Sequence, residues 1–234
     1  LKIIDKLTTM LTTLWKVINK DKDFYVANVV IRSIADNVAL LFLIYNKDEG
    51  EIRILRHYLF LLDGIRSRLA NLIIPIKNDD ITEEEYQKLV KQQEDFKSML
   101  NGCKKYIIEC ITSLKIYNTN KLGIDMLMKN KKGEELYNWK FKTLNIVPSQ
   151  INTEKNTYNW KSMYSEIKLP EKFFSSFLSD YVHGLSMSNI TIAPDKQNMG
   201  TLVYITKVLM ERIELFVRKY YAIELKDIKK NTKQ

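Results

Sequence analysis

The feature that most constrains this chain is an apolar stretch near its start, from Phe24 to Tyr45. The stretch contains no Gly or Pro, and its polar residues are Asn28, Arg32, Ser33, Asp36 and Asn37. It is too long for a β-strand, and a helix that is apolar on nearly every side has to be buried among other helices. The sequence therefore predicts a buried central helix over about residues 24–45.

Three of these polar residues follow one another at a spacing of four. Asn28, Arg32 and Asp36 therefore form one stripe along the predicted helix, and Arg32 and Asp36 are placed to form an ion pair. A buried charge without a partner is very costly, so we expect further partners from later parts of the chain. A structural ion pair and a catalytic pair are both consistent with this pattern.

Four further segments have apolar residues at the three-to-four spacing of amphipathic helices. They cover residues 1–20, 52–74, 82–117 and 198–226. Pro75 is expected to end the second of them, and a capping-box pattern at Thr82 to Glu85 begins the third. No alternating strand pattern is present. The sequence therefore predicts an all-α fold, a multi-helix bundle in which residues 1–234 form one domain around the central helix.

The segment near 118–157 has a weaker helical pattern and is rich in Asn, Lys and Thr. We expect an insertion of short helices and irregular connections, which would suit a lid or a small subdomain. After it, Pro170 is placed to begin a helix with an aromatic inner face, and Gly184 is placed to end that helix.

The chain is basic, with 37 Lys and Arg against 28 Asp and Glu and a net charge of +9. This excess is what an anionic partner such as RNA would require. It is also what an AT-rich genome would produce, because most of the basic residues are Lys. Binding requires the charges to gather in a stripe, so the sequence leaves both interpretations open.

The two cysteines, Cys103 and Cys110, are seven residues apart in a helical pattern. Seven residues of helix rise about 10 Å, which is too far for a disulfide bond. A reduced, cytoplasmic setting is therefore expected. The longest uninterrupted apolar run, of eight residues, is well short of a membrane helix, so we expect no membrane contact. Homodimers often bury the apolar faces that a bundle leaves over, and the sequence leaves a homodimer open.

His183 is the most notable candidate for chemistry, since it is one of two histidines and imidazole transfers protons near neutral pH. It lies in the last turn of the helix that Gly184 ends, close to Tyr181. One interpretation is a structural histidine that binds a carbonyl group or Asp180. The other places His183 and Tyr181 with Arg32 or Arg53 in a site for phosphate or another anion.

The predicted helix 52–74 has a charged face opposite its apolar one. Arg53, Arg56 and His57 lie on that face and are candidates for anion binding, although an exposed surface histidine would fit equally well. The sequence has no Walker loop, no Gly-x-Ser-x-Gly elbow, no Cys-x-x-Cys pair and no dinucleotide fingerprint. We expect neither a metal site nor a cofactor.

Two pairs of blocks resemble a group of uncharacterised bacterial helical proteins that is similar to the HEPN superfamily. They read RSIADNVALLFLIY with RILRHYLFLLDGIRSR, and WKSMYSEI with FLSDYVHG. Arg32 and Asp36 match the first pair, and Ser179, Tyr181 and His183 match the second. The resemblance implies a helical bundle. Many HEPN proteins are ribonucleases of toxin–antitoxin and antiviral systems, so it also implies a protein that acts on RNA.

The chain departs from the HEPN nuclease pattern, in which His follows Arg after about four to six residues of one helix. No arginine precedes His183 within that window, and only three residues separate Arg53 from His57. The function expected first is therefore a regulatory or defence-associated module without catalysis. The alternative is a metal-independent ribonuclease or RNA-binding protein, with His183 as general acid or base and Arg32 or Arg53 holding the phosphate.

Overall fold

The computed structural model describes residues 2–73, 75–77, 80–178 and 196–221. Within these ranges helices dominate, and β-structure is limited to two isolated bridges, Lys129 with Glu135 and Phe141 with Thr157. The predicted all-α fold is confirmed.

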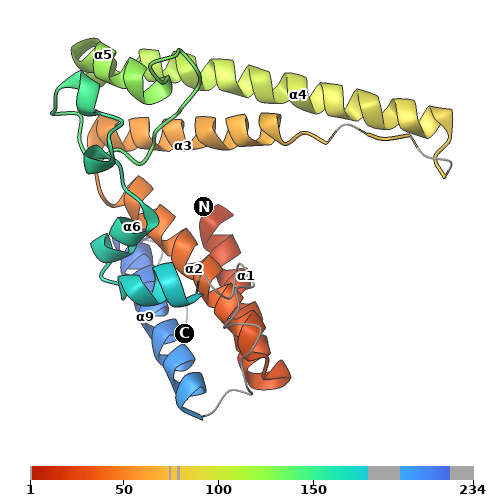
Figure 1. Ribbon diagram of the computed structural model, residues 1–234, viewed down its shortest axis with the longest axis vertical. Coiled ribbons are helices and arrows are strands. Elements are labelled where there is room, and N and C mark those ends of the chain that lie inside the picture. Colours follow the sequence, from red (N-terminus) through yellow and green to blue (C-terminus); the bar gives the residue numbers. More distant parts are fainter. Residues whose placement is uncertain (1, 74, 78–79, 179–195, 222–234) are drawn as a thin grey trace, which may run out of the picture. The chain divides into compact units, whose positions relative to one another are not determined.

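Within the described ranges the main elements are seven α-helices, which Figure 1 labels, and two short π-helical segments. They are α1 (Lys2–Lys16), η1 (Val17–Asp21), α2 (Phe24–Tyr45), α3 (Gly50–Ala70), α4 (Glu83–Thr112), α5 (Lys115–Met128), α6 (Trp160–Glu166), η4 (Phe173–Phe177) and α9 (Lys196–Tyr220). Two 3-10 turns, η2 (Pro148–Gln150) and η3 (Glu154–Asn156), lie between α5 and α6.

The chain divides into two compact units. The first unit joins residues 1–47 with 158–234, and the second holds residues 48–157. The segment 118–157 belongs to the second unit together with α3 and α4. It contains most of α5, both 3-10 turns and the two bridges, which is the mixture of short helices and irregular connections that its composition predicts.

In the first unit α2 is the central helix, as predicted. α1, α6 and α9 all pack against it, and α1, α2 and α9 run side by side in Figure 1. The side chain of Asp23 begins α2 by accepting the N–H of Val26 at 2.9 Å, which satisfies one of the free donors of the first turn. Ile31, Ile34 and Leu41 are fully buried. Burial of each such side chain stabilises the fold by about 1.5–3 kcal/mol.

By length and composition alone, α2 could also cross a membrane. This is weak support for a membrane span, since the core helix of a soluble bundle has the same properties. Of its most apolar 18-residue window, 61% is buried inside the structure.

In the second unit α3 and α4 run side by side, and α5 packs on both at one end (Figure 1). The carboxylate of Glu51 in α3 accepts the backbone N–H groups of Lys115 at 3.1 Å and Ile116 at 2.7 Å. An anion at the start of a helix is favourable because it satisfies free donors at the positive end of the helix dipole. Glu51 thereby fixes the start of α5 against α3.

Two helix ends differ from the prediction. α3 ends at Ala70 rather than at residue 74, because the backbone N–H and the side-chain amide of Asn71 both donate to Ser67 O and cap the last turn. Ile73, beyond the end of this helix, is 79% exposed. α4 starts with the predicted capping box at Thr82 and Glu85 but ends at Thr112, and a separate α5 follows.

The N-terminal and C-terminal helices of the first unit also differ from the prediction. The N-terminal helix continues from α1 into the π-helical η1, and its apolar Trp15 is 58% exposed. The C-terminal helix was expected over 198–226, and α9 is described from Lys196 to Tyr220. Residues beyond 221 and the helix end at Gly184 lie outside the described residues.

Candidate functional site

The Arg32–Asp36 ion pair that the spacing in α2 predicts is present. Arg32 Nε donates to Asp36 Oδ1 at 3.0 Å, and the two side chains are 13% and 28% exposed. Asn28, one turn earlier, is buried and donates its side-chain amide to Phe24 O at 2.7 Å. The polar stripe of α2 thus lies inside the first unit and requires partners from other elements.

Those partners come from the later half of the chain, from α6 and η4. The hydroxyl of Tyr164 donates to Asp36 Oδ1, and Arg32 NH1 donates to the backbone carbonyl of Phe174. The guanidinium of Arg32 also lies 5.3 Å from the centre of the Tyr164 ring, a cation–π distance. We refer to Arg32, Asp36, Tyr164 and the Phe174 carbonyl as the α2 cluster.

The local structure of α6 and η4 explains how these partners reach α2. A capping box between Asn159 and Ser162 begins α6, and Tyr164 lies buried in the helix. In the π-helical η4, Leu178 N–H donates to Phe173 O, five residues back. This wider turn departs from the usual helical bonding pattern, and the next carbonyl, that of Phe174, accepts from Arg32.

The electrostatics of the α2 cluster keep Tyr164 as a proton donor. Burial raises the pKa of its hydroxyl, and the hydrogen bond to Asp36 and the negative charge of that carboxylate raise it further. Hydrogen bonds that involve a charged group each contribute about 1.5–3 kcal/mol to stability. The cluster therefore holds α2, α6 and η4 together.

His183 and Tyr181, the two remaining candidates on this side of the chain, lie outside the described residues, as do Ser179 and Asp180. Their predicted roles stay predictions.

Arg56 of α3 lies inside the second unit, so its predicted place on the charged outer face, as an anion-binding residue, is wrong. It is fully buried. Its Nε and NH2 donate to Asp48 Oδ2 at 2.7 and 2.5 Å, and NH1 donates to Trp139 O and Phe141 O, both at 2.7 Å. The guanidinium also lies 4.1 Å from the centre of the Phe141 ring. This arrangement fixes the 139–141 segment against α3 and engages the donors of Arg56.

A second contact between α3 and this segment is made by Asp63. Its Oδ2 accepts the indole N–H of Trp139 at 3.0 Å, and its Oδ1 accepts from Arg66 NH2 at 2.6 Å. The sequence does not predict either role. On the charged face of α3, Arg56 and Asp63 therefore bind the 139–141 segment of the same unit, and Arg66 binds Asp63.

Arg53 and His57, the other two candidates in α3, are both partly buried. Arg53 makes no ion pair within the described ranges. His57 lies 6.1 Å from Tyr58 between ring centres, and burial lowers the pKa of its imidazole. Arg32 and Asp36 belong to the first unit and Arg53, Arg56 and His57 to the second.

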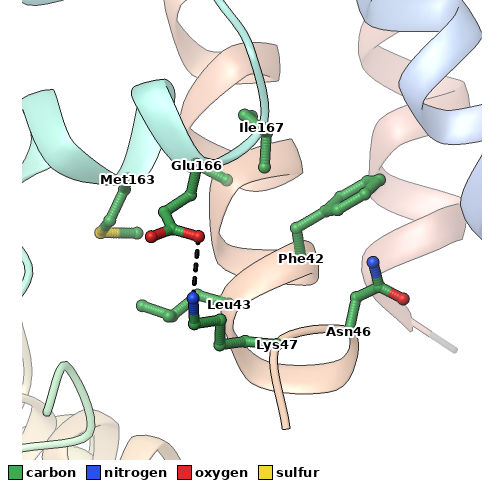
Figure 2. A pocket seen from close by; sticks show the side chains of 8 residues that line it. Phe42, Leu43, Asn46, Lys47, Met163, Glu166 and Ile167 are labelled. Atoms are coloured by element: carbon green, nitrogen blue, oxygen red, sulfur yellow. Dashed lines mark hydrogen bonds and ion pairs between the residues drawn. The ribbon is translucent and has the colours of Figure 1, made fainter. Parts of the chain in front are cut away.

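A small pocket lies between the end of α2 and α6, and Figure 2 shows its lining. Lys47 Nζ donates to Glu166 Oε2 at 2.9 Å across it, and Phe42, Leu43 and Met163 contribute apolar walls. The hydrogen bond to Glu166 raises the pKa of Lys47. The pocket volume of about 180 Å³ suits a few water molecules or a small ion rather than a drug-sized ligand, whose sites have about 300–1,000 Å³.

A wider groove of about 910 Å³ lies between α1 and α9. Trp15 of α1 and Val203 and Met210 of α9 contribute exposed apolar side chains to it. Lys207, Glu211 and Glu214 lie on its α9 side. The groove explains why Trp15 is exposed: its side chain lines an open surface rather than the core.

In the part of the chain that the structure describes, no three His, Cys, Asp or Glu side chains gather in a way that could hold a metal ion. Comparison of the chain with protein-family models, with curated proteins and with solved structures found no match.

Proposed function

We propose that this chain is a HEPN-like helical module with a regulatory or defence-associated role, in which the α2 cluster stabilises the fold and performs no catalysis. The observation that supports this best is that the chain itself satisfies the cluster. Arg32 binds Asp36 and the carbonyl of Phe174, and Tyr164 donates to Asp36. A catalytic arginine or carboxylate needs free atoms that face a substrate, whereas these atoms are engaged with one another.

A metal-independent ribonuclease or RNA-binding protein is the second candidate. One observation favours it. Both hydrogen bonds to Asp36 reach Oδ1, and the Asp36 side chain is 28% exposed, so its second oxygen can contact solvent. In this candidate His183 is the general acid or base, and Arg32 or Arg53 binds the scissile phosphate.

An RNA cleavage assay in the presence of EDTA separates the two candidates. The proposed function predicts no cleavage of single-stranded or hairpin RNA by the purified chain. Cleavage that a His183→Ala variant loses, while its helicity and melting temperature match the wild type, would establish the ribonuclease instead. Arg53→Gln is the matched test of the phosphate-binding role.

RNA binding without cleavage is tested by titration at several salt concentrations. The proposed module should bind RNA weakly or not at all. An affinity that falls steeply with salt would show that the net charge of +9 serves a nucleic-acid partner and would overturn the proposal.

A further inference from the structure

One side of α4 carries apolar side chains that are exposed. Phe96 is 36%, Met99 is 52% and Tyr106 is 67% exposed, and Leu89 and Cys103 are exposed as well. The same helix has buried side chains at Leu100, Ile107 and Ile111, and the exposed set lies next to these positions on the helix surface. With 30 residues α4 is longer than the 21-residue α3 beside it (Figure 1).

The spacing of the exposed residues is that of a second helix-packing seam. Leu89, Phe96 and Cys103 are seven residues apart, and Gln92, Met99 and Tyr106 repeat the same interval three residues later. This is the a and d pattern of a coiled coil, in which such positions pack against a facing helix. We call these six residues the outer stripe.

Gly102 lies beside the outer stripe, at a point where the described residues leave room for a side chain. Gly102 lies inside α4, and a Cβ atom added there would meet nothing within 4 Å. Glycine within a helix costs about 1 kcal/mol relative to alanine. If another helix packs closely against this side of α4, glycine at position 102 avoids a clash between a side chain and that helix.

The outer stripe is complementary to itself when a second copy of α4 runs antiparallel. In that register Leu89 faces Tyr106 of the second copy, Phe96 faces Met99, and Gln92 faces Cys103, since all three pairs are symmetric about one point between residues 97 and 98. Each contact then occurs twice, as in an interface with two-fold symmetry.

The charges that flank the outer stripe agree with this register. Lys88 and Glu109 are both exposed, and neither forms an ion pair within the described ranges. The antiparallel register places Lys88 on the same flank as Glu109 of the second copy, at nearly the same height. In a parallel, in-register pair Lys88 would lie beside Lys88 of the second copy and Glu109 beside its Glu109. Like charges repel, so this arrangement is unfavourable.

We propose that the outer stripe of α4 is a self-association surface through which two copies of this chain pair as antiparallel helices. The proposal concerns the second unit alone and does not depend on the role of the α2 cluster.

The first test is the mass of the chain in solution, measured by light scattering across a concentration series. The wild type should be a dimer. The double variant Phe96→Glu and Met99→Glu should be monomeric with unchanged helicity, because it places like charges in the central layers. Lys105→Glu, an exposed change on another side of α4, should remain dimeric. A monomeric wild type, or a dimer that the double variant leaves intact, would overturn the proposal.

The second test fixes the register by thiol cross-linking with a short bismaleimide in a Cys110→Ser background. Gln92→Cys should cross-link to Cys103 of the second copy, whereas Ser98→Cys, on another side of the helix, should not. Cys103 alone should give little product, because in this register the two copies of Cys103 are offset by eleven residues, about 16 Å of helix. Efficient cross-linking of Cys103 to its own copy would show a parallel pair and contradict the proposal.

Charge reversal gives a third readout that does not disturb the apolar layers. Lys88→Glu and Glu109→Lys should each weaken the dimer, and the double reversal should restore it. If the double variant is as weak as the single ones, Lys88 and Glu109 are not neighbours across the interface and the antiparallel register is wrong.

Discussion

The hydroxyl of Tyr164 donates to the carboxylate of Asp36, which lies 128 residues earlier in the chain. The same carboxylate oxygen accepts from Arg32, so one atom joins a local ion pair of α2 to helix α6, from a later part of the sequence. The first unit is formed from two distant parts of the chain, residues 1–47 and 158–234. This contact is one of those that join the two parts.

Tyr164→Phe should lower the free energy of unfolding by about 1–3 kcal/mol, because it leaves a partly buried carboxylate without one of its donors. Urea denaturation followed by circular dichroism measures the change. Tyr158→Phe is the matched control. It removes a hydroxyl that donates to Glu166 at 3.1 Å, but Glu166 is 43% exposed and can bind water instead, so the loss should be smaller. Equal losses in the two variants would argue against a special role for the α2 cluster.

Arg56→Leu should destabilise the second unit by about 3–5 kcal/mol, since removal of one partner leaves the Asp48 carboxylate uncompensated. The carbonyl oxygens of Trp139 and Phe141 lose their donor as well. The comparison is Arg53→Leu, in the same helix and without an ion pair among the described residues, which should change stability by about 0.5 kcal/mol or less. Thermal melting of both variants measures the difference in stability loss. Similar melting temperatures would contradict a structural role for the buried Arg56.

Asp63→Ala should destabilise the chain by about 1–3 kcal/mol, because the indole N–H of the buried Trp139 loses its acceptor. Asp63→Asn should cost less, as its amide oxygen can still accept that hydrogen bond. Denaturation followed by tryptophan fluorescence measures both variants. A loss in Asp63→Asn as large as that in Asp63→Ala would show that the ion pair with Arg66 matters more than the indole contact.

Stability should fall on mild acidification because of His57. Burial lowers the pKa of this imidazole in the folded chain below its ordinary value of 6.5. Just below that value the unfolded chain binds a proton that the folded chain does not, so the contribution of His57 is fully present above pH 6.5 and is lost as the pH falls.

His57→Gln should therefore show a smaller drop in melting temperature than the wild type between about pH 7.5 and pH 5.5, the range in which histidine titrates. Scanning calorimetry at several pH values measures both slopes. Identical slopes would show that the protonation of His57 is not linked to folding.

The central helix could be predicted from the sequence because its signal is local. A long run that is apolar on all sides allows only a buried helix, and the spacing of Arg32 and Asp36 alone predicts their ion pair. The partners of that pair could not be predicted. Tyr164 is one of 13 tyrosines, and the contact at Phe174 is made by a backbone carbonyl, which every residue carries.

The sequence around Arg56 contains a signal for its burial. It lies three residues before the buried Leu59 and directly after the buried Leu55, so it borders the apolar face of α3 rather than the opposite one. Its charge, by contrast, favours an outward position. The acceptors that make burial possible come from Asp48 and from the 139–141 segment, and no local pattern shows that this segment folds back onto α3.

The way Arg56 holds the 139–141 segment determines which sequence changes this turn can accept. Two of its contacts end on main-chain oxygens, which survive any replacement of the side chain between them, that of Lys140. Insertion or deletion of one residue there would instead move one oxygen out of reach of the guanidinium. At this turn, the number of residues between the two oxygens therefore matters more than which side chain stands between them.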